Sequence, residues 1–150
     1  MPKAKPKETF EIVLFNGLAT DSGNKYDLAT IESIAMDINS GNGPILEEMD
    51  PIGRKVQGKE LYEAWKEHAM ADAVSCRLEN NVLFVTFAIR NTKYGKMLKS
   101  TLDTHGIRGI YFFPVGYGTP DSDGVIQGYH LCYVSFEPRN AMKVGSIGNQ

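Results

Sequence analysis

The sequence predicts an α+β domain in which a mostly antiparallel sheet, or a partly open barrel, packs with about three helices. Three observations lead to this fold class. Several short segments alternate apolar and polar residues, as half-buried strands do, and Asn80-Asn81 joins two of them as a tight-turn dipeptide. Apolar residues recur at helical spacing in three other segments. Predicted hairpins outnumber strand–helix–strand crossovers, which favours antiparallel pairing.

The composition is that of one ordinary globular domain. Of the 150 residues, 42% are hydrophobic and 23% are charged, and the net charge of −2 makes nucleic acid an unexpected partner. We predict a flexible basic tail over 1–8, a folded domain over 9–138 and a polar tail over 139–150. The basic tail is interpreted as a solubilising end, with contact to nucleic acid or an acidic surface as the alternative. No apolar run approaches the ~20 residues of a membrane span, so no membrane association is expected.

The first elements are a strand and a helix. Residues 9–16 have a nearly continuous apolar centre and predict a strand, which the turn around 21–24 follows. Asp27 is a suitable N-cap for a helix, because its carboxylate accepts from free amides of the first turn. The apolar stripe of that helix is Leu28, Ile31, Ile34, Ala35 and Ile38. The Gly- and Pro-containing segment 39–44 ends it.

The middle of the chain predicts a short strand, a helix and a hairpin. The strand falls within 45–53 and leads into a loop, and the helix covers about 59–71 with Trp65 on its inward face. Residues 74–79 alternate as a half-buried strand. Residues 82–89 are apolar on both faces and predict a central strand.

The last third predicts a helix and a second hairpin. The helix covers about 92–105, and Gly106 is its C-terminal stop. Two strands follow, over 107–113 and 125–136, with the turn 119–124 between them.

The two cysteines, Cys76 and Cys132, both fall in predicted strands. Their positions favour buried free thiols in a reducing compartment over a disulfide, and zinc-binding spacing is absent.

The three histidines also have structural interpretations. His130 and Cys132 share one sheet face, whereas Ser135 points to the other, so a thiol beside a hydrogen-bonded histidine is favoured over a catalytic pair. His68 is expected to pack in the core, and His105 to favour the negative end of its helix dipole.

Two acidic segments have carboxylates of the kind that bind metal ions. Glu47, Glu48 and Asp50 form a cluster for which a solvated loop is favoured over a metal or glycosidase site. Residues 121–124 resemble part of a calcium loop but lack its closing glutamate, so a hairpin turn is predicted. We therefore predict no metal, cofactor or catalytic residue.

Aromatic residues concentrate in one predicted strand and just beyond it: Tyr111, Phe112, Phe113 and Tyr117. They could stack on bases, but no basic cluster surrounds them. A role in the core or in an interface is therefore expected.

The segments Ile107–Gly118 and Tyr129–Asn140 together resemble the last third of phage prohead (head-maturation) proteases. The opening strand and glycine turn at 15–19, the Pro-x-Leu stretch at 44–50 and the helix 92–105 are similar in order and spacing. The resemblance covers about 9–142. It implies the prohead-protease fold and, in active members, a serine nucleophile with a histidine base.

Neither catalytic residue is found at the matching position. Tyr111 or Phe112 stands where the resemblance places the serine, and Glu48 or Met49 where it places the histidine. A thioether accepts no proton at neutral pH, and a phenol with a pKa near 10 is a poor acyl-transfer nucleophile.

The function expected from this resemblance is a non-catalytic phage structural or capsid-assembly protein. It would bind capsid or scaffold protein, form a homo-oligomer and occur in the host cytoplasm, with the virion as a second location. One alternative is an active prohead protease with displaced catalytic residues. The other is a small phage protein that binds and inhibits a host enzyme.

Overall fold

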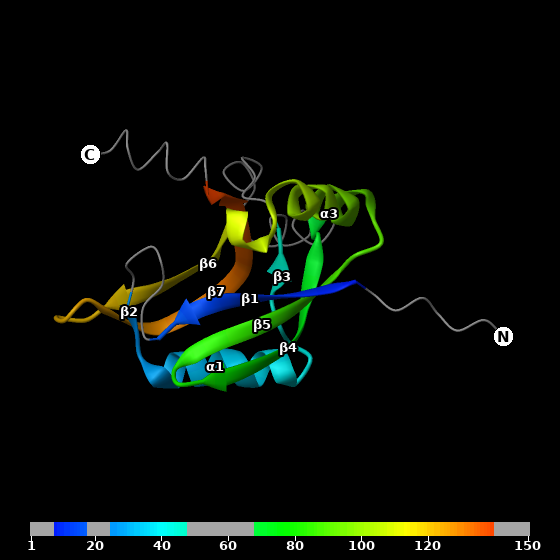
Figure 1. Cartoon of the computed structure of the whole chain (residues 1–150). Coiled ribbons are helices and arrows are strands. Elements are labelled where there is room, and N and C mark those ends of the chain that lie inside the picture. The colour runs from blue at the N-terminus through cyan, green and yellow to red at the C-terminus, as the bar shows by residue number, and fades with distance from the viewer. Residues whose placement is uncertain (1–7, 18–24, 48–67, 140–150) are drawn as a thin grey trace, which may run out of the picture.

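The computed structural model describes residues 8–17, 25–47 and 68–139 (Figure 1). Roughly half of these residues lie in strands. The strands are β1 (Thr9–Asn16), β2 (Lys25–Tyr26), β3 (Ile45–Leu46), β4 (Ala71–Glu79), β5 (Val82–Ile89), β6 (Ile110–Pro120) and β7 (Val125–Pro138). The helices in the described ranges are α1 (Leu28–Asn39), α3 (Lys93–His105) and the short 3-10 helix η2 (Ile107–Gly109).

All the strands belong to one curled sheet. Its order is β1-β5-β4-β3-β7-β2, and β6 pairs with β7 as well. Only β2 and β3 run parallel to β7, and every other pairing is antiparallel. The sheet bends into a half-barrel, with α1 below it and α3 at its upper end (Figure 1). The predicted α+β class, with a mostly antiparallel and partly open barrel, is confirmed.

A single hydrophobic core fills the curl of the sheet. Helix α1 contributes Ile31, Ile34 and Ile38, which are all buried and spaced three or four residues apart. Phe10 links the two ends of the sheet, because its ring lies 5.8 Å from that of Phe87 on β5 and 5.9 Å from that of Phe112 on β6. Helix α1 and the two ends of the curled sheet therefore pack on the same hydrophobic core.

The helix ends follow the predicted capping chemistry. The Asp27 carboxylate accepts a 2.8 Å hydrogen bond from the Thr30 amide at the start of α1. At α3 the Thr92 hydroxyl accepts from the Gly95 amide at 3.1 Å. Gly106 ends α3 with φ of 72°, a conformation that favours glycine.

The hairpin β4–β5 is also confirmed. Asn80 and Asn81 have φ of 51° and 65°, so both central residues of the turn are left-handed, as a type I′ turn requires. Strand β5 lies between β1 and β4, in the central position that its two apolar faces predict.

Several predicted boundaries are wrong. Strand β4 begins at Ala71, three residues before the predicted strand, because Ala71 and Ala73 are buried in the sheet and small residues carry little strand signal. The helix predicted over 59–71 lies mostly outside the described residues, so two of the three expected helices are described, and its predicted end is strand. Residues 107–109 form η2 rather than strand.

Three further differences concern strands. The predicted strand within 45–53 is described only at Ile45–Leu46, since 48–53 lie outside the described residues. Strand β6 continues to Pro120 because β7 pairs with it through a Gly-rich segment that has little strand propensity of its own. The two-residue β2, which was not predicted, forms through its pairing with β7.

Replacement of Asp27 tests the cap of α1. Hydrogen bonds from Thr30 hold the pKa of Asp27 below its ordinary value of 3.8, so the cap stabilises the fold above that pH and is lost as pH falls through the folded-state pKa. We expect Asp27→Ala to lower the free energy of unfolding by about 1 kcal/mol at pH 7, because the cap is only part-buried and caps contribute about this much. Denaturant unfolding at pH 7 and pH 3 should show the stability difference between Asp27→Ala and the parent chain shrinking at pH 3.

Asp27→Asn, which keeps a neutral hydrogen-bond acceptor, is the control and should lose less stability, with little pH dependence. An equal loss of stability at both pH values for Asp27→Ala would contradict the assignment of Asp27 as a charged N-cap.

Gly95 tests how closely α3 approaches the end of β5. A Cβ built on Gly95 would lie 1.8 Å from the backbone oxygen of Arg90, so alanine forces the two elements apart. We expect Gly95→Ala to destabilise the protein by roughly 3 kcal/mol, which is the upper range for overpacking. Gly109→Ala, whose Cβ would meet only the Cβ of His105 at 3.2 Å, is the matched control and should cost much less in thermal unfolding.

Candidate functional site: the seam between strands β1 and β6

Two strands of the half-barrel have a free edge facing the same groove. Within the described residues β1 pairs only with β5, and β6 pairs only with β7. The groove that runs along these edges, here called the seam, has a volume of about 630 Å³. Its lining residues are Glu11, Ile12, Val13, Leu14, Asn16, Val82, Phe84, Ile107, Arg108, Ile110, Phe112 and Arg139.

The backbone of β1 presents alternate residues to the seam. The Ile89 amide donates to the Glu8 carbonyl at 2.8 Å, which makes these two opposed residues a hydrogen-bonded pair of the antiparallel ladder. Such pairs alternate along the strand. The N–H and C=O groups of Thr9, Glu11 and Val13 therefore point away from β5 and into the seam.

The backbone of β6 has a matching alternation. Ile110 lies opposite Pro138 and Pro114 lies opposite Val134, and a proline N cannot donate to a neighbouring strand. The Val134 carbonyl accepts instead from the Glu47 amide at 2.9 Å, on the side of β7 away from β6. Phe112 thus directs its backbone groups to the seam, as β1 does from the other side, whereas the Ile110 amide donates to the Ile107 carbonyl.

The floor of the seam is apolar. Leu14 and Ile110 are buried there, and Phe112 contacts Phe10 beneath it. At the rim Val13 and Ile107 are each 43% exposed, although both are large aliphatic side chains. Unpaired backbone groups over an apolar floor are what a bound extended segment requires.

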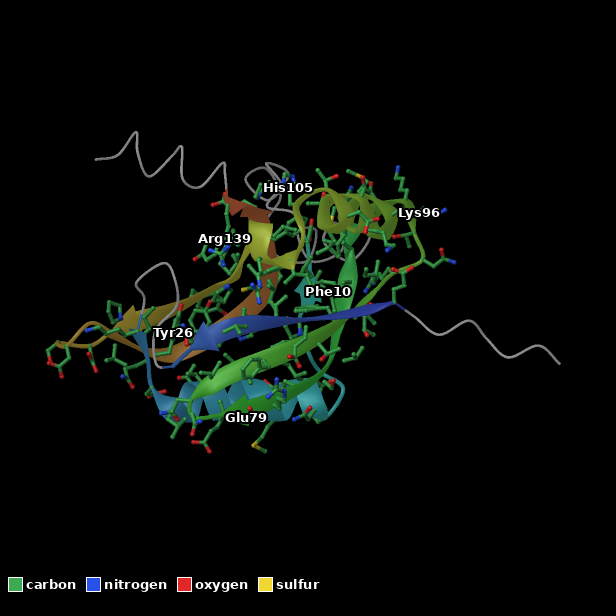
Figure 2. All side chains as sticks on the ribbon, in the orientation of Figure 1. Phe10, Tyr26, Glu79, Lys96, His105 and Arg139 are labelled. Atoms are coloured by element: carbon green, nitrogen blue, oxygen red, sulfur yellow. The ribbon has the colours of Figure 1, made fainter. Side chains whose placement is uncertain are left out.

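One end of the seam is positively charged. Arg108 is exposed, and Arg139 donates from Nε to the Arg108 carbonyl at 3.0 Å while lying over the Tyr111 ring. Figure 2 shows Arg139 at the end of β7, beside the start of β6. The one acidic lining residue, Glu11, is bound by Arg77 at 3.1 Å, and this hydrogen bond raises the pKa of Arg77. Glu11 therefore offsets little of the positive charge.

The positions matched to the protease residues are placed as follows. Tyr111 and Phe112, which stand at the serine position, are neighbours on β6 with opposite faces and are both buried. Glu48, Met49 and Asp50 lie outside the described residues. Glu47 is only 4% exposed, so the prediction of a solvated carboxylate is wrong for this residue. Burial follows from the hydrogen bond between its amide and β7.

The buried thiol predicted beside His130 is only part-buried, at Cys132. His130 is exposed and its ring packs on Tyr117, with 5.2 Å between ring centroids. Cys132 lies at a register shift of the β6–β7 ladder and is half-buried. Cys76 is also half-buried, and its thiol donates to the Ala35 carbonyl at 3.4 Å. Both thiols are free, as predicted, but neither is fully buried.

The remaining candidate residues take part in packing, capping or turn formation. The His68 ring lies 4.6 Å from that of Tyr94, and His105 is exposed in the last turn of α3, as expected from its position. Asp121 accepts from the Asp123 and Val125 amides at 2.9 and 3.0 Å, which confirms the hairpin turn. Tyr117 is 66% exposed at the β6–β7 tip, whereas Tyr111 stacks on Phe113.

Metal sites and membrane-spanning helices are absent from the part of the chain that the structure describes. No group of three His, Cys, Asp or Glu residues there could hold a metal ion. None of the described helices has the length and apolar character to cross a membrane.

Sequence reasoning missed several residues of the seam. Ile107 and Arg108 were assigned to the start of a strand and Arg139 to a tail, although together they form the charged end. One signal was present in the sequence: Pro114 inside an apolar strand is typical of an edge strand. The approach of β1 to β6, almost a hundred residues later, had no local signal.

Comparison of the chain with protein-family models, curated proteins and solved structures finds no match. The resemblance to prohead proteases therefore stays a prediction.

The cysteines provide a test of the surroundings of the candidate His130–Cys132 pair. Burial raises the pKa of both Cys132 and Cys76, so less thiolate is present at pH 7 than for an exposed thiol. We expect each to react with a disulfide reagent several-fold more slowly than a free thiol model compound. The Cys76→Ser and Cys132→Ser variants each leave one thiol, so they show which reaction rate belongs to which cysteine. Labelling of Cys132 faster than the model thiol would instead indicate activation by a neighbouring base.

Proposed function

We propose that the chain is a non-catalytic phage structural or capsid-assembly protein that binds capsid or scaffold protein through the seam. The observation that carries the proposal is an apolar groove between two strand edges, those of β1 and β6, that no other described strand pairs. Proteins usually protect such edges with lysine, proline or a covering element. Strand β1 has neither lysine nor proline along its length, which supports a role for this edge in binding.

The phage assignment itself comes from the resemblance to prohead proteases. A substituted serine position supports the non-catalytic form of that proposal, because buried Tyr111 and Phe112 offer no acyl-transfer nucleophile. The proposal includes self-association into a homo-oligomer and a place in the host cytoplasm and the virion. Sedimentation velocity of the purified chain tests the self-association.

Quantitative mass spectrometry of gradient-purified proheads and mature heads tests the capsid role. We expect a stoichiometric, full-length signal that is retained in mature heads. A signal that is clipped or lost on maturation would favour the active protease, whose residues would then lie elsewhere in the chain. Absence from both particles would contradict the proposal and favour the host-enzyme inhibitor.

A further inference from the structure

A second groove lies between helix α1 and strand β7. Strand β2 pairs with β7 at Val125 and Ile126, and β3 pairs with the same edge at Val134. Between these two points no described strand covers β7, and α1, which connects β2 to β3, lies opposite (Figure 1). The groove, here called the α1 cleft, has a volume of about 570 Å³ and shares no lining residue with the seam.

Both walls of the α1 cleft have hydrogen-bonding groups. On the helix, Thr30, Ser33 and Asp37 recur every three or four residues and therefore lie along one side of α1. Asn42, in the loop after the helix, continues this wall. The other wall is the backbone of Gly128–Cys132, which has a register shift against β6 at each end. Within the described residues no backbone hydrogen bond joins this stretch of β7 to α1.

The charge of the two walls selects a cation. The chain has 16 Lys and Arg residues, but none of them occurs in 26–47 or in β7. The same range 26–47 has four acidic residues: Asp27, Glu32, Asp37 and Glu47. Of these, Asp27 and Asp37 line the α1 cleft. An anionic ligand would therefore meet carboxylates and no Lys or Arg, whereas a cation is attracted.

The Asp37 end of the cleft is the stronger site for a positive charge. Asp37 is exposed in the last turn of α1, and that turn has no basic residue to complement the negative end of the helix dipole. At the other end, the Asp27 carboxylate already accepts from the Thr30 amide, and the positive end of the dipole offsets its charge. A cation therefore binds first at Asp37, and Asp27 adds a weaker second attraction.

The length and the apolar part of the cleft fit an elongated ligand. Asp27 and Asp37 are ten positions apart, which corresponds to about 15 Å along a helix. Between them the lining includes Ile34, which is buried, and Leu131, which packs against the hydrophobic core. An aliphatic chain with an ammonium group at each end matches this pattern, because its methylene groups cover apolar surface while its charged ends lie near carboxylates.

We propose that the α1 cleft binds a linear polyamine. One terminal ammonium group binds Asp37 and the Asn42 side chain, the methylene chain packs over Ile34 and Leu131, and the other end extends toward Asp27. Each primary ammonium group donates three hydrogen bonds, for which the hydroxyls and carbonyls of the two walls are acceptors. This site is separate from the seam and does not depend on the proposed capsid role.

Protection of Cys132 tests occupancy of the cleft in the full parent chain. Cys132 lines the cleft, whereas Cys76 does not and donates its thiol hydrogen to the Ala35 carbonyl. We expect spermine, a linear tetraamine, to slow the reaction of Cys132 with a neutral disulfide reagent at least about fivefold at saturation, because little free cleft remains. The reaction of Cys76 should be unchanged. Mass spectrometry of the digested protein distinguishes the two thiols without any substitution.

Charge reversal at Asp37 tests the position of the ammonium group. Asp37→Lys should weaken spermine binding at least about tenfold in titration calorimetry, because it replaces attraction by repulsion. The helix should tolerate this change, since a lysine in the last turn complements the dipole. Glu32→Lys, the same charge change on α1 outside the cleft, is the matched control. It should alter the affinity less than about twofold at an ionic strength of about 0.15 M, where the Debye length is ~8 Å.

Three results would overturn the polyamine site. The first is no protection of Cys132, or equal protection of both thiols. The second is equal weakening by Asp37→Lys and Glu32→Lys, which would indicate diffuse attraction to an acidic surface. The third is protection of Cys132 by sorbitol as strong as that by spermine, because the cleft would then select hydroxyl groups rather than charge. Specific protection in a chain that is absent from phage heads would sustain the site and refute only the capsid role.

Discussion

Strand β7 (Val125–Pro138) is the constraint on which the rest of the sheet depends, because it hydrogen-bonds three other strands. One edge of β7 pairs with β6 along most of its length. Its other edge is taken by β3 at Val134 and by β2 at Val125 and Ile126. Helix α1 connects β2 to β3, so the pairing with β7 also positions α1 against the core. The short strands β2 and β3 have few bonds of their own and persist through this shared partner.

The curvature that follows from this arrangement leaves two edges facing one groove. A closed barrel would pair β1 with β6 and satisfy their backbone groups. Here the two strands meet through Phe10 and Phe112 in the core while their outward backbone groups stay unpaired by any described strand. Pro114 adds to this, since a proline on β6 cannot donate a ladder bond. The groove is therefore a consequence of incomplete closure of the sheet.

Much of the fold was predictable because its signals are local. The Asp27 cap, the Asn80-Asn81 turn and the Gly106 helix stop each depend on the conformational preference of one or two residues. The failures occur where pairing overrides propensity. Ala71 and Ala73 are strand residues because neighbours hydrogen-bond them, and the glycines of β6 are extended because β7 lies alongside. Glu47, expected in solvent, is buried because its amide bonds Val134.

By itself the sequence determined most of the longer helices and strands, the α+β class and the two free thiols, since periodicity, capping and cysteine count act within short stretches of chain. Only the tertiary structure decided that β1 and β6 face one another and that Arg108 and Arg139 share one end of the groove between them. The physical reason is that sheet curvature and edge pairing are set by contacts between segments far apart in the chain. No short window of residues encodes such contacts.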